Sequence, residues 1–162
     1  MFEDLDGFII PKLTHKFLEW KGELKPHSYG GKPIVDYNGT PLFAEIAILQ
    51  DYLHQGYDGF WIDSFSKKLR KHSLVDEKSN YKLPNLLIEK LNKFKSNGIY
   101  GGTWDLIIWN ESEILFIELK RKNKDRIQNS QIEFMKAAIA HDFTTENFRI
   151  LEWEFTSEIN AC

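Results

Sequence analysis

The stretch that decides the fold is residues 104–120, which read WDLIIWNESEILFIELK. Two apolar runs enclose the polar segment Asn110–Glu113. Runs rich in β-branched and aromatic residues on both sides of a four-residue polar loop are typical of a β-hairpin. We therefore expect two antiparallel strands whose register places Asp105 opposite Glu118.

Charged side chains of this hairpin converge on one side of the predicted sheet. Side chains alternate along a strand, so Asp105, Glu118 and Lys120 share a face with apolar neighbours. Two carboxylates opposite each other destabilise a sheet unless something compensates. A divalent cation between Asp105 and Glu118 would compensate, since Mg²⁺ favours carboxylate oxygens, and Lys120 would orient a water or stabilise developing negative charge. The alternative is a surface ion cluster in which Lys120 neutralises both acids.

The surrounding pattern alternates helices and strands, which predicts an α/β fold with a mixed sheet. The predicted helices cover Pro11–Trp20, Thr40–Gln55, Pro84–Lys95 and Gln128–Ala140. The predicted strands, with Trp109 opposite Ile114 in the hairpin, cover Tyr57–Phe65, Trp104–Trp109, Ile114–Lys120 and Phe148–Phe155. Turns are expected at Asn38-Gly39 and Asn97-Gly98, and an irregular loop at Ser66–Lys82.

Two further polar residues lie on apolar helix faces. Glu45 shares the stripe of Leu42 and Leu49, where a carboxylate needs a partner. It either reaches solvent at the edge or points toward the same acids. Gln131 begins the face continued by Phe134. It either holds a water or a neighbouring ligand, or is only a polar residue near a helix end.

The chain has 162 residues, a mass of 19.1 kDa and a formal net charge of −3, which fits one domain. The negative total argues against a nucleic-acid partner, but the charge is unevenly spread. Residues 65–126 hold 14 Lys plus Arg and 8 Asp plus Glu, whereas the rest hold 7 and 16. This basic middle is either a solvated surface or a stripe that meets phosphates.

Other sequence features exclude several classes of protein. The only cysteine, Cys162, leaves no internal disulfide or Cys-rich zinc site. No apolar run is long enough to cross a membrane, and from the acidic N-terminus we expect no signal peptide. We expect a single-domain cytoplasmic protein with no membrane partner. There is no P-loop, and the histidines lack HExxH spacing.

The motif around the hairpin is more specific than any of its members. Residues 98–109 read GIYGGTWDLIIW and residues 116–120 read FIELK, with Asp125-Arg126-Ile127 and then Gln131 following. Residues 91–95, LNKFK, precede the glycine-rich stretch. This D…ExK arrangement resembles the PD-(D/E)xK nuclease superfamily and, within it, the VRR-NUC family, over Thr40 to Trp153. Trp104 stands where many relatives carry proline.

The resemblance implies a restriction-endonuclease-like αβββαβ core and a metal-dependent phosphodiesterase. Asp105 and Glu118 would ligate Mg²⁺ or Mn²⁺, with the Leu119 carbonyl as an added ligand. Glu45 would lie near the metal, Lys120 would position the attacking water, and Gln131 would steady Lys120 or that water. The basic residues that would then straddle the nucleic-acid backbone are Lys67, Lys68, Arg70, Lys71, Arg121, Lys122, Lys124 and Arg126.

The resulting hypothesis is a homodimeric endonuclease that cuts DNA, with branched or junction DNA as the expected structure, in recombination, repair or restriction. The alternative is a non-catalytic nucleic-acid-binding or interaction module that retains the fold. We expect an extension of unassigned role at residues 1–39, the nuclease domain at 40–155 and a tail at 156–162. Trp61, Trp104 and Trp109 would stack on bases or, alternatively, pack in the core.

Overall fold

The computed structural model describes residues 1–24, 26–27, 29–74, 80–95 and 98–156. Of the features expected from the sequence, Cys162, nearly all of the C-terminal tail and the first residue of the turn Asn97-Gly98 lie outside these ranges.

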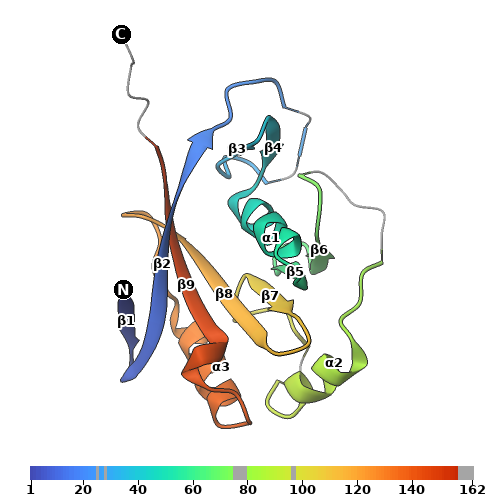
Figure 1. Ribbon diagram of the computed structural model, residues 1–162, viewed down its shortest axis with the longest axis vertical. Helices are drawn as coiled ribbons and strands as arrows, with labels where there is room; N and C mark the ends of the chain where they lie inside the picture. The colour runs from blue at the N-terminus through green and yellow to red at the C-terminus, as the bar shows by residue number, and fades with distance from the viewer. Residues whose placement is uncertain (25, 28, 75–79, 96–97, 157–162) are drawn as a thin grey trace.

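A mixed sheet forms the centre of the described residues (Figure 1). Its strands follow the order β4-β3-β2-β9-β8-β7-β5-β6, and β1 pairs with β2 outside this path. The strands are β1 (Phe2–Leu5), β2 (Phe8–Glu19), β3 (Val35–Tyr37), β4 (Thr40–Leu42), β5 (Asp58–Asp63), β6 (Lys68–Arg70), β7 (Leu106–Trp109), β8 (Ile114–Arg121) and β9 (Phe148–Phe155). Strand β8 runs antiparallel to β7 and parallel to β9.

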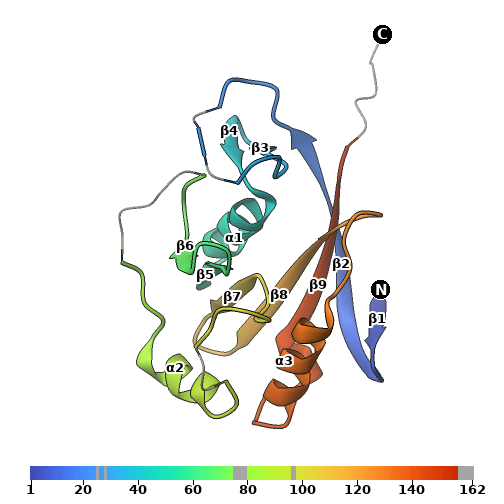
Figure 2. The same ribbon diagram turned by 180° about the vertical axis from the view of Figure 1, so that it is seen from behind.

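Helices cover both faces of this sheet, as the two opposite views show (Figure 2). The helices are α1 (Ala44–His54), α2 (Asn85–Asn92) and α3 (Asn129–Ile139), with a short 3₁₀ helix η1 (Thr145–Asn147) before β9. One core lies under α1 and the other under α2 and α3. The expected fold class, a restriction-endonuclease-like mixed sheet flanked by helices, is confirmed.

The hairpin has the register expected from its sequence. Trp109 lies opposite Ile114, and the pairing continues to Leu106 opposite Ile117. Alternate residues enter different cores, because Leu106 and Ile117 pack under α1 while Phe116 packs under α2 and α3. Both faces of this central hairpin are therefore buried, which explains its nearly continuous apolar sequence.

The helix predicted at Thr40–Gln55 begins later than expected, and this is a correction. Thr40 and Pro41 belong to β4, and α1 starts at Ala44. The turn at Asn38-Gly39 is confirmed, since both residues have positive φ and Tyr37 pairs with Thr40. A two-residue turn of this type favours a hairpin, so the chain after Gly39 pairs back onto β3 before it can become helical.

The prediction of a helix at Pro11–Trp20 is wrong, because residues 11–19 lie in β2. Residues 12–17 pair in parallel with residues 150–155 of β9. The spacing of Leu13, Phe17 and Trp20 is compatible with a helix, but Leu13 is exposed while Phe17 is buried. Pairing with a distant strand therefore decides the conformation here, as tertiary context often does. Because β3 lies before residue 39 and pairs with β4, which begins at residue 40, the sheet is continuous across residues 39 and 40.

The segment Ser66–Lys82 also holds more structure than the expected loop. Within it, β6 pairs antiparallel with β5, placing Arg70 opposite Trp61. The sequence pattern predicted a loop here because residues 67, 68, 70 and 71 are all charged.

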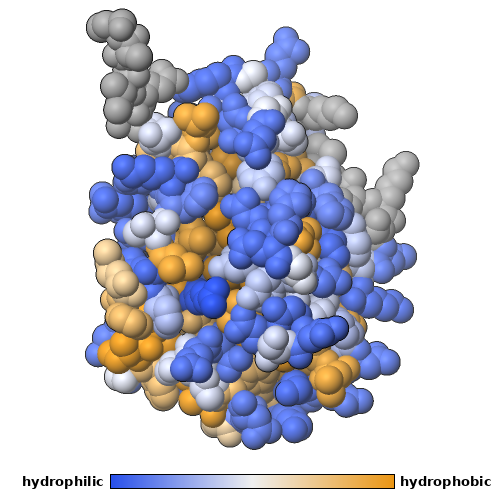
Figure 3. Space-filling view, in the orientation of Figure 1, coloured by the Kyte–Doolittle hydropathy of each residue, from blue (hydrophilic) through white to orange (hydrophobic). Residues whose placement is uncertain are grey.

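Hydrophilic side chains cover much of the face seen in Figure 3. Hydrophobic ones reach the surface at lower left, around β1 and the start of β2, where Met1, Phe2 and Ile9 are exposed. In the described ranges, no helix is both long and apolar enough to span a membrane.

Candidate active site

The candidate site lies where β7 and β8 part. β7 begins at Leu106, whereas β8 continues to Arg121 beside β9. Asp105 stands just before β7 and is joined to β8 by two reciprocal hydrogen bonds. Its backbone N–H donates to Glu118 Oε2 at 2.9 Å, and the Leu119 N–H donates to Asp105 Oδ2 at 3.0 Å. The two carboxylates are thus held next to each other at the end of the shared pairing.

Lys120 and Gln131 complete the side of the site that faces α3. Lys120 Nζ lies 3.2 Å from Glu118 Oε1 and 3.4 Å from Gln131 Oε1. Gln131 Nε2 donates to the same Glu118 oxygen at 2.6 Å. Gln131 Oε1 also accepts the backbone N–H of Gln128 at 2.9 Å, at the start of α3. The helix terminus therefore fixes the amide that contacts both the acid and the lysine.

Glu45 reaches the site from α1, on the opposite face of the sheet. Its Oε1 accepts a hydrogen bond from Lys32 Nζ at 2.8 Å. Its Oε2 is buried and has no hydrogen-bond partner among the described residues. A buried carboxylate oxygen without a partner is costly, so this atom marks a place where a cation or a donor would fit.

The electrostatics of the acids reflect their mutual proximity. Burial, reinforced by the charges of Glu118 and Glu45, holds the pKa of Asp105 well above its usual range. Burial also raises the pKa of Glu118, although Lys120 and the hydrogen bonds from Asp105 and Gln131 oppose that shift. Both carboxyls therefore favour their charged form less than free carboxyls do, unless a positive charge joins them.

Lys32 is a residue of this site that the sequence did not indicate. Burial is the largest single effect and disfavours its ammonium, but the surrounding acids, Glu45 above all, together outweigh burial and raise the pKa of Lys32. Asp105 and Asp125 add to this upward shift. Lys32 lies 13 residues before Glu45, between β2 and β3. No motif marks it, because its position depends on how the N-terminal segment packs.

The loop before Asp105 packs closely against α3. A Cβ on Gly102, whose φ is +76°, would lie 3.1 Å from the Ser130 carbonyl oxygen, so only glycine fits there without strain. Trp104 is fully buried, and its Nε1 donates to the Gln131 carbonyl at 3.0 Å. Trp61 is also buried, and Trp109 packs against Phe60. Core packing, rather than base stacking, is the role of Trp61 and Trp104.

The basic residues after β8 line two cavities beside the acids. One, of about 280 Å³, is lined by Lys32, Pro33, Ala44, Glu45, Leu119, Arg121, Lys124, Asp125 and Trp153. The other, of about 340 Å³, is lined by Lys120, Asn123, Lys124, Asp125, Arg126 and Gln128. Lys124 borders both. Lys122 is exposed and lies 3.5 Å from Glu154, while the Arg121 guanidinium lies over the rings of Trp153 and Phe155.

The other predicted basic group sits around β6. Lys67 and Lys68 are exposed in and after the turn that follows β5. Lys71 forms an ion pair with Asp58. Arg70 is buried, and its Nε donates to Asp63 Oδ2 at 2.8 Å. Its guanidinium is therefore turned into the protein and is not available on the surface for a phosphate.

The oxygen-rich character of the site suits a hard divalent cation, which prefers carboxylate and carbonyl ligands. The observation that fits such an ion is Glu45 Oε2, which has no hydrogen-bond partner among the residues that the structure describes. Across the described ranges, however, no three His, Cys, Asp or Glu side chains are arranged closely enough to hold a metal by themselves. A metal here would need a backbone carbonyl, such as that of Leu119, together with water or substrate oxygens.

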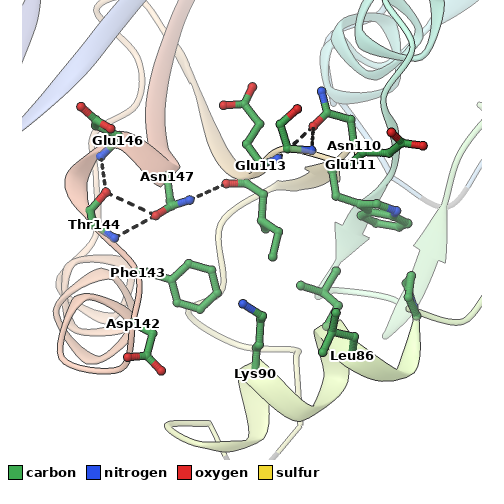
Figure 4. A pocket seen from close by; sticks show the side chains of 15 residues that line it. Leu86, Lys90, Asn110, Glu111, Glu113, Asp142, Phe143, Thr144, Glu146 and Asn147 are labelled. Atoms are coloured by element: carbon green, nitrogen blue, oxygen red, sulfur yellow. Dashed lines mark hydrogen bonds between the residues drawn. The ribbon is translucent and has the colours of Figure 1, made fainter.

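A separate cavity of about 580 Å³ lies at the other end of the hairpin, where β8 starts (Figure 4). Leu86 and Lys90 of α2, the turn residues Asn110 and Glu111, and residues around η1 line it. Trp109, one of the tryptophans considered for base stacking, borders this cavity, but none of the predicted catalytic, metal-binding or basic residues does.

Comparison with known families agrees with this geometry. The VRR-NUC domain family matches residues 44–149, which is more than half of the chain. The match includes Glu45, Asp105, Glu118, Lys120 and Gln131, and leaves out Lys32. A search among curated proteins found no match. The chain belongs to the VRR-NUC family, a nuclease family of the PD-(D/E)xK type, and its function is of the nuclease type.

Proposed function

We propose that this VRR-NUC chain hydrolyses phosphodiester bonds of DNA with the help of a divalent metal ion, Mg²⁺ or Mn²⁺. The observation that carries the proposal is the interlocked pair of acids at the parting of β7 and β8. Asp105 and Glu118 each accept a backbone N–H from the other's strand, and Lys120 lies beside them. Such a pair raises the pKa of its members and needs a positive charge.

The proposed ligands are Asp105, Glu118 and the Leu119 carbonyl, with Glu45 at the metal directly or through a water. When bound, the metal would lower the pKa of a water molecule and neutralise charge developing on the phosphate. Lys120 would hold the attacking water with its ammonium. Gln131 would restrain Lys120 and Glu118 at once, which the hydrogen bonds of its amide support.

The segment between β8 and α3 is the proposed contact for the DNA backbone. Lys124 and Arg126 are exposed there and line the cavity that also holds Lys120. Positive side chains next to an acidic metal site attract the backbone and release its counterions. Lys67 and Lys68 are proposed as a further contact, and Arg70 is excluded because it is buried against Asp63.

The preference for branched or junction DNA, endonucleolytic cutting and the homodimer stay predictions. A homodimer would present two sites to one substrate. Sedimentation of the purified protein with and without four-way-junction DNA measures the oligomeric state directly.

The test of the proposed function is cleavage of linear, nicked and four-way-junction DNA with Mg²⁺ or Mn²⁺. Wild type should cut at least one substrate, and EDTA should stop it. Asp105→Asn and Lys120→Met should not cut, whereas Glu111→Gln, which changes an exposed acid in the hairpin turn, should cut like wild type. A protein that binds these DNAs but cuts none would instead be the non-catalytic module.

A further inference from the structure

The segment before the matched family region contributes a lysine to the site. Lys32 lies outside residues 44–149, yet its Nζ is 2.8 Å from Glu45 Oε1. The ammonium also stands 5.4 Å from the centroid of the Phe43 ring and 5.6 Å from that of Trp61. These are distances at which an aromatic face attracts a cation. The position of the Lys32 ammonium is therefore defined by Glu45, Phe43 and Trp61.

The backbone on either side of Lys32 is held by contacts with the rest of the protein, so the position of Lys32 does not depend on a loop without contacts. Tyr29 packs against Phe43, with ring centroids 4.9 Å apart, and its hydroxyl donates to the buried Asp63. The Lys32 N–H donates to the Tyr29 carbonyl at 3.3 Å. On the other side, Ile34 accepts the Trp20 N–H at 3.1 Å, and Val35 begins β3.

The contact with Lys32 divides the two oxygens of Glu45 between different tasks. Oε1 is taken by the ammonium. Oε2 is buried and has no hydrogen-bond partner in the part of the chain that the structure describes. Both Lys32 and Glu45 line the cavity of about 280 Å³ that also reaches Leu119. An acid held by one oxygen presents the other in a fixed direction, which is how outer partners orient metal ligands.

We propose that Lys32 is a positioning residue that holds Glu45 through Oε1 so that Oε2 faces the metal and its water. This rests on the proposed nuclease function. The effect of Lys32 therefore passes through Glu45 and not through the DNA. A lysine that instead contacted a phosphate would act on DNA affinity.

The experiment compares Lys32→Met, Lys32→Arg, Glu45→Gln and the double variant Lys32→Met/Glu45→Gln with wild type. The matched control is Lys21→Met, since Lys21 is an exposed lysine of the same segment that pairs with Glu19. Three quantities are measured: Mn²⁺ affinity by calorimetry without DNA, DNA affinity in EDTA, and the cleavage rate at saturating DNA and Mg²⁺. Circular dichroism checks that each variant is folded.

Lys32→Met should lower Mn²⁺ affinity and the saturated cleavage rate by about tenfold, as expected for loss of an outer partner of a metal site. Its DNA affinity in EDTA should stay within about twofold of wild type, because a phosphate contact is not lost. Lys32→Arg should restore most of the rate. In the Glu45→Gln background the same change should have little further effect, which is the signature of two residues acting as a unit.

Three results would overturn the inference. Tighter Mn²⁺ binding by Lys32→Met would make Lys32 a competitor of the metal. A loss of DNA affinity with a salt dependence reduced by about one phosphate contact would make it a DNA ligand. Equal effects of Lys32→Met in the wild-type and Glu45→Gln backgrounds would show that the two residues act independently. If wild type neither binds Mn²⁺ nor cuts DNA, the proposed function itself fails, which is a different outcome.

Discussion

Asp63 and Asp105 lie at the same end of neighbouring strands, yet their surroundings are opposite. β5 pairs with β7, and the Ile62 N–H donates to the Asp105 carbonyl at 2.7 Å. Burial alone would raise the pKa of both acids. At Asp63, hydrogen bonds from Tyr29 and Arg70 outweigh burial and lower the pKa. At Asp105, the charges of Glu118 and Glu45 add to burial and raise it.

This difference separates an acid whose ionised form stabilises the fold from an acid whose ionised form is unfavourable in the fold. Asp63 has a cationic partner, Arg70, and a hydrogen-bond donor, Tyr29, so its ionised form favours the folded state. Asp105 faces acids, so its ionised form opposes the folded state until a cation arrives. Sites that store an unfavourable charge in this way are frequently functional.

The largest expected effect comes from removing the charge of Asp105. Asp105→Asn should reduce DNA cleavage by at least about a thousandfold, or about 4 kcal/mol in the barrier. It should also raise the melting temperature of the metal-free protein, because the unfavourable charge is gone. Cleavage assays and thermal unfolding in EDTA measure the two effects. A variant that melts well below wild type would show that Asp105 is a stabilising residue like Asp63.

The second effect comes from breaking the buried ion pair between Arg70 and Asp63. Arg70→Met should lower the free energy of unfolding by about 3–5 kcal/mol, since it leaves a buried carboxylate without its cation. The double variant Arg70→Met/Asp63→Leu should lose less, because no charge is left unpaired. Urea unfolding measures both. A double variant less stable than Arg70→Met would contradict this account of the pair.

Added metal should stabilise the folded protein only by binding the acids around Asp105. Mn²⁺ at about a hundred times its dissociation constant should stabilise wild type by about 2.7 kcal/mol. The gain should disappear in Asp105→Asn and persist in Glu111→Gln. Thermal unfolding across a Mn²⁺ titration measures the gain. Equal stabilisation of all three proteins would place the ion elsewhere.

The pH dependence should also distinguish the two acids. Asp105 binds its proton more tightly in the folded chain, so it lowers stability as the pH rises above the usual carboxyl range near about 4. Its penalty is absent in acid and present at neutral pH. Asp63 has a lowered pKa, so its contribution is present above that range and is lost as the pH falls through its folded pKa. Metal-free Asp105→Asn should therefore gain on wild type as the pH rises from about 4 through the folded pKa of Asp105, as measured by urea unfolding.

The smallest effect is expected at the surface next to these acids. Lys124→Ala should weaken DNA binding modestly and reduce the slope of affinity against salt by about one phosphate contact. Fluorescence anisotropy at several salt concentrations measures the slope. The matched control is Lys93→Ala, since Lys93 is an exposed lysine near Asp142. A slope unchanged in Lys124→Ala would remove this residue from the DNA contact.

The part of the fold that was predictable from sequence is the part set by neighbours in sequence. The hairpin register follows from its own turn, so Asp105 and Glu118 could be paired in advance. The limits of β9 were also predictable, because apolar and aromatic residues recur from Phe148 to Phe155 after a polar segment. Glu45 and Gln131 were indicated as polar residues on apolar helix faces, and the structure brings both to the acids.

What could not be predicted depends on contacts between distant segments. β2 is a strand because it pairs with β9, more than a hundred residues away, and its own spacing is compatible with a helix. Arg70 was grouped with surface lysines because burial against Asp63 is not visible in sequence. Lys32 was unassigned for the same reason, since Tyr29 and Trp61 determine where it lies.

The parallel pairing of β2 with β9 has a consequence for how the chain acquires its structure. Strand pairing between residues 12–17 and 150–155 closes a loop of more than a hundred residues, and contacts of large sequence separation form slowly. During synthesis, β2 emerges long before its partner, so Ile10 and Phe17, both buried in the finished protein, wait unprotected. The pairing of β2 with β9 can therefore form only after residues 150–155 have been synthesised, later than the hairpin of β7 and β8.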